Sequence, residues 1–419
     1  MTPEVKKRIE QIHQGIVPDG YTKTRSGITP TTWTPACLGN IYTERREPGN
    51  ESLPLLTVSI HSGVSDGELD EDELPKKVKR IEDKSQYKRA ATGDLVFNMM
   101  RAWQGAIGTV RTEGMVSPAY IVAKPNGKVY PPFMDYYMKA PRMVGMINRQ
   151  SYGVTDFRKR LYWDSFAPIP CVLPPVREQK KIAEILSTQD KAIELQARKI
   201  EELKRFKKGC LEKMFPRKGQ KVPEKRFPGF TDDWEQRKLG EVFEEYSEKN
   251  HSELPVLTIL QGSGTIHRDE SDRSLLYDKS NLSNYKMVHE DDFIVHLRSF
   301  EGGLEIATNT GIISPAYHTF HGENTDSRFY YSYFRSKRFI DIDLKPHVYG
   351  IRDGRSIDIE GMKTIKIPFP YYEEQKAIGT YIRNLDNLIA LHQRKLEEMK
   401  KQKKALMQLL LTGIVRVQS

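Results

Sequence analysis

Cysteine is scarce in this chain. Among 419 residues there are three, Cys37, Cys171 and Cys210, which lie far apart and form no Cys-x-x-Cys pair. This spacing indicates neither a disulfide framework nor a zinc site, and it fits a reducing cytoplasm. The ten histidines form no His-x-x-x-His pair, and His318 and His321 lack the carboxylate or cysteine ligands that would accompany them in the sequence of a metal site. We therefore expect no metal site in this chain.

Long apolar runs and catalytic motifs are also missing. No segment approaches eighteen consecutive apolar residues, and the N-terminal sequence lacks the apolar core of a signal peptide, so we expect a cytoplasmic protein without membrane spans. The Gly-x-x-x-x-Gly-Lys-Ser/Thr sequence of ATP-binding loops does not occur. An adenine methyltransferase would carry an Asn/Asp-Pro-Pro-Tyr/Phe tetrapeptide and a glycine-rich cofactor loop, and neither is found. We expect no catalytic residues and no enzyme activity.

Positive charge exceeds negative charge. The chain has 66 Lys and Arg against 56 Asp and Glu, which gives a formal net charge of +10 and a pI near 9.2. This balance suits a polyanionic partner such as nucleic acid without proving one. With 38% hydrophobic and 10% aromatic residues, the chain is long and apolar enough for two or three folded domains.

The most informative feature is a long helical segment that occurs twice, 196 residues apart. Pro174–Phe215 returns as Pro370–Leu411, and both copies open with Pro-x-x-x-Glu-Gln-x-x-Ile. Apolar residues alternate three and four positions apart along both copies, which is the seam pattern of a coiled coil. We expect two antiparallel helices, each on the order of 60 Å long, that bury their seams against each other. The predicted seam residues are Leu186, Ile193, Ile200, Leu203, Ile382, Ile389, Leu396 and Met399.

Polar residues interrupt both seams at matching positions. Gln196 and Lys207 of the first helix correspond to His392 and Lys403 of the second. Polar seam residues commonly fix register and pairing at some loss of stability. The other basic residues around the two lysines are interpreted as the solvent-facing side of the coiled coil, with docking of a partner protein as the alternative.

The repeat continues outside the helices. The sequence Trp-x-x-x-x-Leu-Gly begins at Trp33 and again at Trp234, and Ser117–Tyr120 returns as Ser314–Tyr317. A period of about two hundred residues, used twice, indicates duplicated domains rather than a solenoid. Between the helices, short strand-like runs are set off by Gly, Pro, Asp and Asn. The predicted strands lie at 55–60, 95–100, 119–123, 256–260 and 292–297.

We therefore predict an α+β fold with a pseudo-twofold internal repeat, in which two strand-rich domains are separated by the two long helices. The predicted segments are an N-terminal helical segment 1–20, a first domain 21–173, a central helix 174–216, a second domain 217–369 and a distal helix 370–419. The sequence Gly15-Ile16-Val17 returns as Gly413-Ile414-Val415. If this echo is meaningful, the two chain ends meet.

Each domain also has two groups of residues that suit contact with DNA. The first group is a turn with an arginine, an aromatic residue and then Gln or Glu, which offers a guanidinium and a base-edge reader at one place. Its aromatic residues, Trp103 and Phe300, are better interpreted as core residues. The second group places a tyrosine and basic residues beside a glycine, where they either hold phosphates or are ordinary solvated charge. The candidate DNA-binding residues are Arg101, Gln104, Tyr152, Arg158, Lys159, Arg160, Arg298, Tyr349, Arg352 and Arg355.

Taken together, these motifs resemble those of one known family. Two variable globular units, each closed by the Pro-x-x-x-Glu-Gln-x-x-Ile helix and opened by Trp-x-x-x-x-Leu-Gly, are similar to the specificity subunit of type I restriction-modification systems. The resemblance implies that 21–173 and 217–369 are target recognition domains, each reading one half of a split, asymmetric DNA site. It also implies that the helices act as spacers and that the subunit itself is not catalytic.

The same resemblance implies the partners. These are double-stranded DNA, two modification subunits that bind S-adenosylmethionine and methylate adenines, and restriction subunits that use ATP with Mg. Base contacts in this family follow no fixed motif, so the candidate residues above rest on their chemistry alone. The alternative function is a coiled-coil scaffold or adaptor that binds protein only and whose positive charge is incidental. The sequence does not specify the recognised bases or the spacer length.

Overall fold

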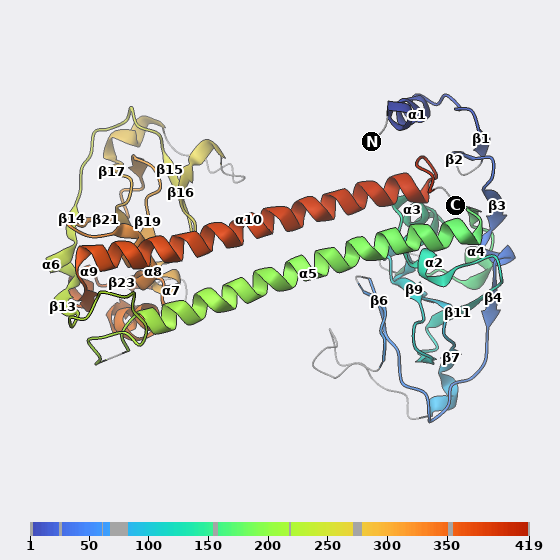
Figure 1. Ribbon diagram of the computed structural model, residues 1–419, viewed down its shortest axis with the longest axis horizontal. Coiled ribbons are helices and arrows are strands. Elements are labelled where there is room, and N and C mark those ends of the chain that lie inside the picture. Colours follow the sequence, from blue (N-terminus) through green and yellow to red (C-terminus); the bar gives the residue numbers. More distant parts are fainter. Residues whose placement is uncertain are drawn as a thin grey trace. The chain divides into compact units, whose positions relative to one another are not determined.

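The computed structural model describes residues 3–24, 27–60, 62–67, 83–153, 158–217, 219–270, 279–350 and 355–417. The chain divides into two compact units. Unit 1 comprises Met1–Leu195 and Leu396–Ser419, and unit 2 comprises Gln196–Lys395. Each long helix therefore contributes one part to each unit (Figure 1).

Unit 1 is rich in short strands. Its helices outside the long pair are α1 (Pro3–His13), α2 (Pro131–Tyr137), α3 (Pro141–Gln150) and α4 (Trp163–Phe166). Its strands are β1 (Tyr21–Thr24), β2 (Gly27–Pro30), β3 (Thr34–Cys37), β4 (Tyr42–Arg45), β5 (Val58–Ser59), β6 (Gly63–Val64), β7 (Lys88–Ala90), β8 (Leu95–Asn98), β9 (Ile107–Thr109), β10 (Gly114–Val116), β11 (Tyr120–Pro125) and β12 (Pro170–Leu173). The central sheet has the order β4-β11-β8-β9 and is antiparallel throughout.

Unit 2 repeats this plan. Its short helices are α6 (Leu239–Val242), α7 (Ser299–Gly302), α8 (Ser327–Phe334) and α9 (Ile359–Lys363). Its strands are β13 (Glu235–Lys238), β14 (Glu244–Tyr246), β15 (Leu257–Leu260), β16 (Gly264–His267), β17 (Lys286–Val288), β18 (Phe293–Val295), β19 (Glu305–Ile306), β20 (Gly311–Ile313), β21 (His318–His321), β22 (Val348–Tyr349), β23 (Ser356–Ile357) and β24 (Lys366–Phe369). The central sheet, β14-β21-β18-β19, has the same antiparallel order as that of unit 1.

The two long helices are α5 (Val176–Met214) and α10 (Tyr372–Leu411). Both start just after proline, where the missing N–H costs nothing, and Gly413 follows α10 with a φ of +74°, a conformation that glycine adopts without strain. The helices pack together and the halves are strand-rich, so the predicted α+β fold is confirmed. Along unit 2, Gln196 and Lys207 of α5 contact His392 and Asp386 of α10, so the helices run antiparallel there.

The helix seam is apolar at its buried positions. Of the predicted seam residues, Leu186, Ile200, Leu203, Ile382 and Ile389 are buried, and Ile193, Leu396 and Met399 are half-buried. The seam lysines form ion pairs with the other helix: Lys207 with Asp386 at 2.6 Å, and Lys403 with Asp190. These two pairs occupy equivalent positions of the repeat, one in each unit.

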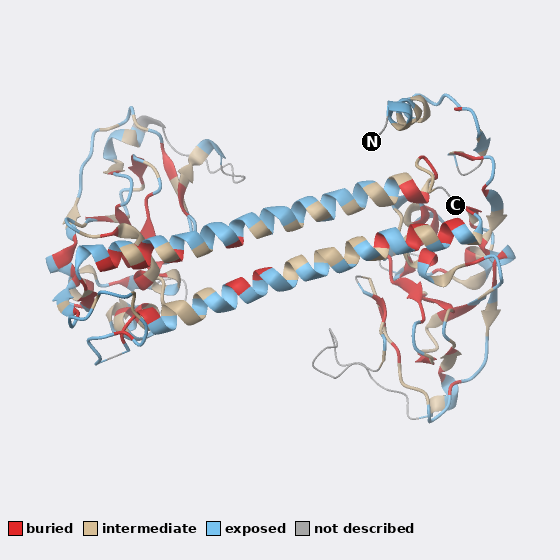
Figure 2. Cartoon of the chain, in the orientation of Figure 1, coloured by how far each residue is buried: buried red, intermediate tan, exposed pale blue. Residues whose placement is uncertain are grey.

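Each unit builds its core on the start of one long helix and the end of the other. In unit 1, Ile182 and Leu186 of α5 and Leu410 and Leu411 of α10 belong to the main core. In unit 2, the same role falls to Ile378, Ile382, Met214 and Phe215. Figure 2 shows buried residues gathered at these helix ends. Burial of these apolar side chains, rather than helix propensity, fixes the helices to the strand-rich bodies.

The two chain ends meet within unit 1, as the sequence echo predicts. The Tyr21 hydroxyl donates to the carbonyl of Gly413 at 2.8 Å, and Arg8 of α1 donates to the carbonyl of Ile414 at 3.4 Å. A side chain at Gly413 would collide with Pro30, since an added Cβ would lie 2.6 Å from its ring. The segment after α10 is thus held against the strands that open the chain.

Candidate nucleic-acid interface

The start of α5 is held in a buried polar cluster in unit 1. Glu178 accepts the indole N–H of Trp33 at 3.2 Å and two bonds from Arg416 at 2.7 and 2.8 Å. The next residue, Gln179, is fully buried; its amide oxygen accepts the backbone N–H of Tyr130, and its amide nitrogen donates to two backbone carbonyls. The Trp and Glu-Gln motifs of the repeat are therefore structural.

The start of α10 is held in the same way in unit 2. Glu374 accepts the indole N–H of Trp234 at 2.9 Å and a two-bond contact from Arg226 at 2.8 and 2.7 Å. Gln375 accepts the backbone N–H of Asp326 and donates to a carbonyl just before the helix. The arginine comes from the segment that follows the other long helix in both units. Sequence reasoning used these motifs to find the repeat but missed this role.

In unit 1 the first candidate group surrounds a single turn. Arg101 stands at the N-cap position of the 3-10 turn Ala102–Gln104, which follows β8, and its side chain makes no capping hydrogen bond. Gly105 ends the turn with a φ of +101°. The side chains of Arg101 and Gln104 are exposed. Trp103 is half-buried, packs against the main core and donates its indole N–H to the carbonyl of Met100 at 3.0 Å.

The second candidate group of unit 1 lies beside this turn. Tyr152 and Arg160 exchange backbone hydrogen bonds of 3.1 and 2.9 Å, and the Lys159 ammonium lies 5.8 Å from the centre of the Trp103 ring. Tyr152 is 59% exposed, and Arg158 and Arg160 are exposed. The structure thus brings the two groups together, which the sequence did not indicate.

Unit 2 forms the same arrangement with different side chains. Arg298 is exposed and stands at the N-cap position of α7 without a side-chain capping bond. The Arg355 guanidinium lies 4.4 Å from the centre of the Phe300 ring and donates to Glu301 at 3.1 Å. Tyr349 is 59% exposed in β22, opposite β23. The remaining candidate, Arg352, lies outside the described residues.

A cation over an aromatic ring therefore marks the same place in both units. Trp103 and Phe300 pack against the cores of their units, which agrees with their interpretation as core aromatics. Lys159 is flanked in the chain by the exposed Arg158 and Arg160, and Arg355 also donates to Glu301. Such a surface can pair with phosphates and can donate or accept hydrogen bonds at base edges.

A polar side chain shapes the turn in each unit, and it is half-buried in unit 2 and buried in unit 1. In unit 2, His296 Nδ1 accepts the backbone N–H of Arg298 at 3.3 Å. Burial, with help from Arg335 and Arg298, lowers the pKa of His296 to about 4, so the ring is neutral at pH 7. In unit 1, Asn98 accepts the N–H of Met100 at 2.9 Å. Sequence reasoning missed both, although an Asn two residues before a turn is a known turn signal.

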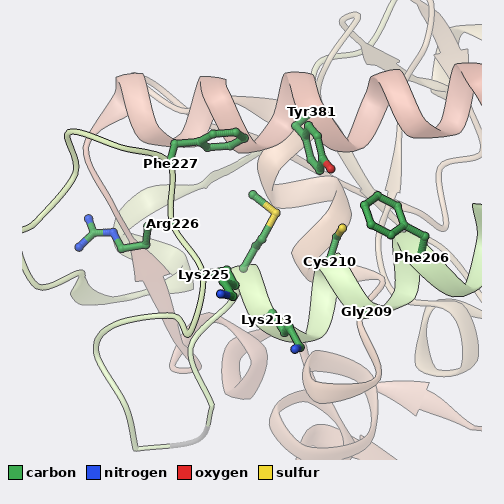
Figure 3. A pocket seen from close by; sticks show the side chains of 9 residues that line it. Phe206, Gly209, Cys210, Lys213, Lys225, Arg226, Phe227 and Tyr381 are labelled. Atoms are coloured by element: carbon green, nitrogen blue, oxygen red, sulfur yellow. The ribbon is translucent and has the colours of Figure 1, made fainter.

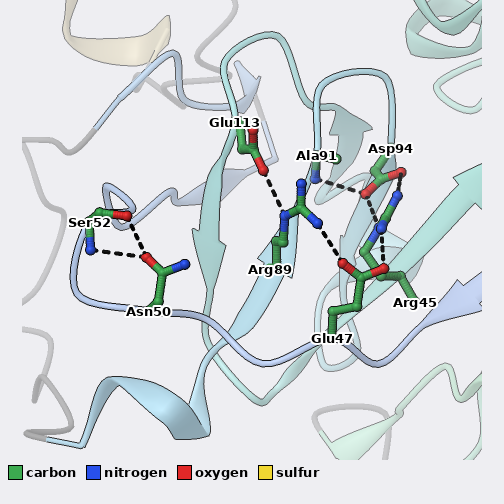
Figure 4. A network of polar contacts seen from close by, with 8 residues as sticks. All are labelled: Arg45, Glu47, Asn50, Ser52, Arg89, Ala91, Asp94 and Glu113. Atoms are coloured by element: carbon green, nitrogen blue, oxygen red, sulfur yellow. Dashed lines mark hydrogen bonds and ion pairs between the residues drawn. The ribbon is translucent and has the colours of Figure 1, made fainter.

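Unit 1 also contains a network of paired charges. Figure 4 shows a network in unit 1 in which Arg45 donates to the buried Asp94 at 2.7 Å and Arg89 bridges Glu47 and Glu113 at 2.7 Å each. Because each charge here has an opposite partner, the network ties β4 and β7 to the residues just before β8 and β10 rather than offering a free catalytic group.

A pocket of about 460 Å³ lies in unit 2 between the last turns of α5, Tyr381 of α10 and the segment 225–227. Cys210 of α5 and Tyr381 of α10 face it, with Phe206 and Phe227 beside them (Figure 3). Burial and the contact with Cys210 raise the pKa of Tyr381. Lys213, Lys225 and Arg226 also line the pocket, and Arg226 is paired with the buried Glu374.

The described residues contain no group of three or more His, Cys, Asp or Glu arranged to hold a metal ion. Within the same residues, no helix has both the length and the apolar character needed to cross a membrane.

Comparison with known proteins decides the family. The model of the "Type I restriction modification DNA specificity domain" matches residues 103–205 and 231–401, well over half of the chain. The chain belongs to this family. It is the DNA specificity subunit of a type I restriction-modification system, with two target recognition domains and no catalytic role of its own.

Individual relatives agree with this specificity subunit over most of their length. The type I restriction enzyme MjaVIII specificity subunit of Methanocaldococcus jannaschii is 28% identical over 73% of this chain and 76% of its own. The HsdS subunit of Thermoanaerobacter tengcongensis has the same fold, with a TM-score of 0.50 at 18% identity over 92% of this chain and 98% of that chain. A solved chain from a study of the complex assembly and conformational transition of the type I R-M system gives a TM-score of 0.54 at 16% identity, over 92% of this chain and 99% of that chain.

Proposed function

We propose that residues 21–173 and 217–369 each read one half of a bipartite, asymmetric DNA site, while α5 and α10 set the spacing and dock the modification subunits. The observation that carries this proposal is the cation-over-aromatic turn, which occurs in both units with the same plan and different side chains. A shared scaffold with exchanged contact residues is what two readers of different half-sites need.

The candidate residues divide the work between base reading and phosphate pairing. Arg101 and Gln104, at the two ends of one exposed turn, suit base edges, since Arg pairs with guanine and Gln with adenine. Arg158, Lys159 and Arg160 suit phosphates, which position the protein without reading sequence. In unit 2, Arg298 takes the base-reading role, and Tyr349, Arg352 and Arg355 take the phosphate-contacting role.

The proposal includes partners outside the chain. Two modification subunits hold S-adenosylmethionine, and restriction subunits use ATP with Mg, so this chain needs no cofactor. Their docking is supported by the exposed apolar residues of the helices, among which Leu195 and Leu391 occupy equivalent positions and are 65% and 63% exposed. We place the assembly in the cytoplasm.

Methylation mapping tests the division into half-sites. Cells that express the chain with its modification subunit should methylate one split site, and Arg101→Ala with Gln104→Ala should relax bases in one half only. Each lost base contact should reduce discrimination by about 1–3 kcal/mol. Relaxation of both halves would contradict independent reading. Replacement of 217–369 by another such domain should change the other half alone.

The spacing role has its own test. Four residues inserted after Glu202 lengthen α5 by about 6 Å and by close to one turn, which keeps the seam nearly in phase. The spacer of the methylated site should change while both half-sites persist. The control is the same insertion after Gln220, in the exposed linker, which should leave the spacer unaltered. An unchanged spacer after the helix insertion would refute the proposal that α5 and α10 set the spacing between the half-sites.

Salt-dependent binding separates this function from that of a protein-only scaffold. The chain with its modification subunit should bind duplex DNA with an affinity that falls as salt rises, because phosphate contacts release counterions. A scaffold whose positive charge is incidental would give no such slope.

A further inference from the structure

In unit 1 a groove of about 650 Å³ lies between the last turns of α10 and the segment that begins at Lys139 and enters α3. Its floor is apolar and includes Met143, Met146, Met407 and Leu411. The described residues that line it include five cations and no carboxylate. The cations are Lys139, Arg142, Lys400, Lys403 and Lys404.

Unit 2 has a groove of about 640 Å³ in the same place, between the end of α5 and the segment after α8. The apolar floor returns as Leu211, Phe215 and Ile342, at the positions of Met407, Leu411 and Met146. All five cationic positions return as well, displaced by 196 residues. They are Arg335, Arg338, Lys204, Lys207 and Lys208.

The two strand-rich bodies differ in most residues, yet every cationic position of the unit 1 groove is cationic in unit 2. The unit 2 groove is also lined by further charged residues without such counterparts, the cations Lys213, Arg217 and Lys337 and the carboxylates Glu212 and Glu224. Part of the charge is used internally. Lys403 pairs with Asp190, Lys207 with Asp386, and Arg335 with the buried Glu305. The outer lysines of the two helices are exposed at the rim, where Lys204 and Lys400 pair with Glu201 and Glu397 of their own helices at 2.8 Å, and Lys208 lies 3.9 Å from Glu212.

Further features of the unit 1 groove favour a negatively charged occupant. Burial lowers the pKa of Lys139, so its ammonium gains from an incoming carboxylate. Thr29 also lines the groove; it is 5% exposed, and its hydroxyl has no hydrogen-bond partner among the described residues. Sequence alone favoured solvent contact for the helix lysines and kept partner docking as the alternative.

We propose that the two grooves are docking sites for an acidic amphipathic helix of the modification subunit, one copy in each groove. The inference rests on the proposed role of the chain in holding two such subunits. An amphipathic helix places apolar residues at three- and four-residue spacing, which suits the floor, and its flanking carboxylates would meet the lysine rim.

The apolar floor favours a polypeptide over DNA as the occupant. Phosphates need cations and water but gain nothing from Met407, Leu211 or Ile342, which are half-buried or exposed in the grooves. A helix with an apolar face removes these side chains from water and completes the charge pairing at the same time. Duplex DNA is the competing occupant, and the experiment is designed to detect it.

The test uses the full chain co-purified with its own modification subunit. Lys400→Glu with Lys404→Glu reverses the rim of the unit 1 groove, and Lys204→Glu with Lys208→Glu reverses that of unit 2. The matched control is Arg205→Glu with Lys401→Glu, which changes exposed residues on the same helices that do not line the grooves. Light scattering after gel filtration gives the number of bound subunits, and titration gives their affinity.

Each groove variant should lose one of two modification subunits, with affinity at that site about tenfold weaker for each reversed charge, while the control keeps both. Thermal melts should be unchanged, since all these lysines are exposed. Full two-subunit assembly by both groove variants would overturn the docking inference and leave the proposed function standing. If the wild-type chain binds no modification subunit, both fall. Weaker binding to a random duplex with intact assembly would instead assign the grooves to DNA and overturn the inference.

Discussion

The buried cluster at the start of α10 allows a quantitative prediction. The side chains of Glu374 and Arg226 are 1% and 11% exposed, and the two bonds between them are 2.8 and 2.7 Å long. Arg226→Met keeps most of the packing volume but leaves the carboxylate of Glu374 buried with only the indole N–H of Trp234 as a charge-stabilising donor at 2.9 Å. Removal of one partner from a buried ion pair costs about 3–5 kcal/mol. Because the indole bond persists, we expect about 3 kcal/mol.

Urea unfolding, followed by tryptophan fluorescence and by circular dichroism, measures this change. The control is Arg217→Met, since Arg217 lies 3.4 Å from Glu224 with side chains 75% and 46% exposed, and such a pair contributes less than about 1 kcal/mol. Adding Glu374→Gln to Arg226→Met should recover part of the loss, because no charge is then left buried. A loss below about 1 kcal/mol for Arg226→Met would refute the reasoning.

Three further predictions follow. The neutral His296, whose pKa of about 4 lies below its ordinary 6.5, contributes stability that is complete above pH 6.5 and is lost as pH falls toward 4. His296→Asn, which copies Asn98 of unit 1, should remove this dependence. The unfolding free energy of the variant relative to the wild type should therefore be about 2 kcal/mol greater at pH 5 than at pH 8. The same difference between variant and wild type at both pH values would contradict this prediction. Gln196→Leu with His392→Leu should raise the unfolding free energy, because this polar pair, in contact at 2.9 Å, occupies the half-buried helix seam at some loss of stability. Unfolding of the double variant at a lower urea concentration than the wild type would contradict this expectation. Arg101→Ala should leave the free energy of unfolding, measured in urea, within about 0.5 kcal/mol of wild type, because the side chain is exposed, and a larger loss would make it a structural residue.

Much of the fold was predictable because its signals are periodic and local. The heptads gave two long helices, which the structure places at Val176–Met214 and Tyr372–Leu411. Predicted strands at 95–100 and 119–123 correspond to β8 and β11, whereas only Val58–Ser59 of the predicted 55–60 run is a strand. Isolated strand signals are weaker, because strand formation depends on partners elsewhere in the chain.

The candidate site was predictable in composition but not in arrangement. Arginine and Gln or Glu at a turn could be recognised from their residue types, and they remain proposed contacts. That Lys159 lies over Trp103, and Arg355 over Phe300, could not be read from the sequence, because nothing local specifies which turn approaches which. His296 was missed for the same reason, since its neutrality follows from burial and from arginines brought close by folding.

By itself, then, the sequence determined the duplication, the heptad seams and hence the class of protein, because each is a pattern repeated along the chain. Tertiary structure alone decided that Glu178 meets Arg416, 238 residues away, and that helix lysines and body arginines line matching grooves. Such contacts depend on the path of the chain and on what each side chain must satisfy once it is buried.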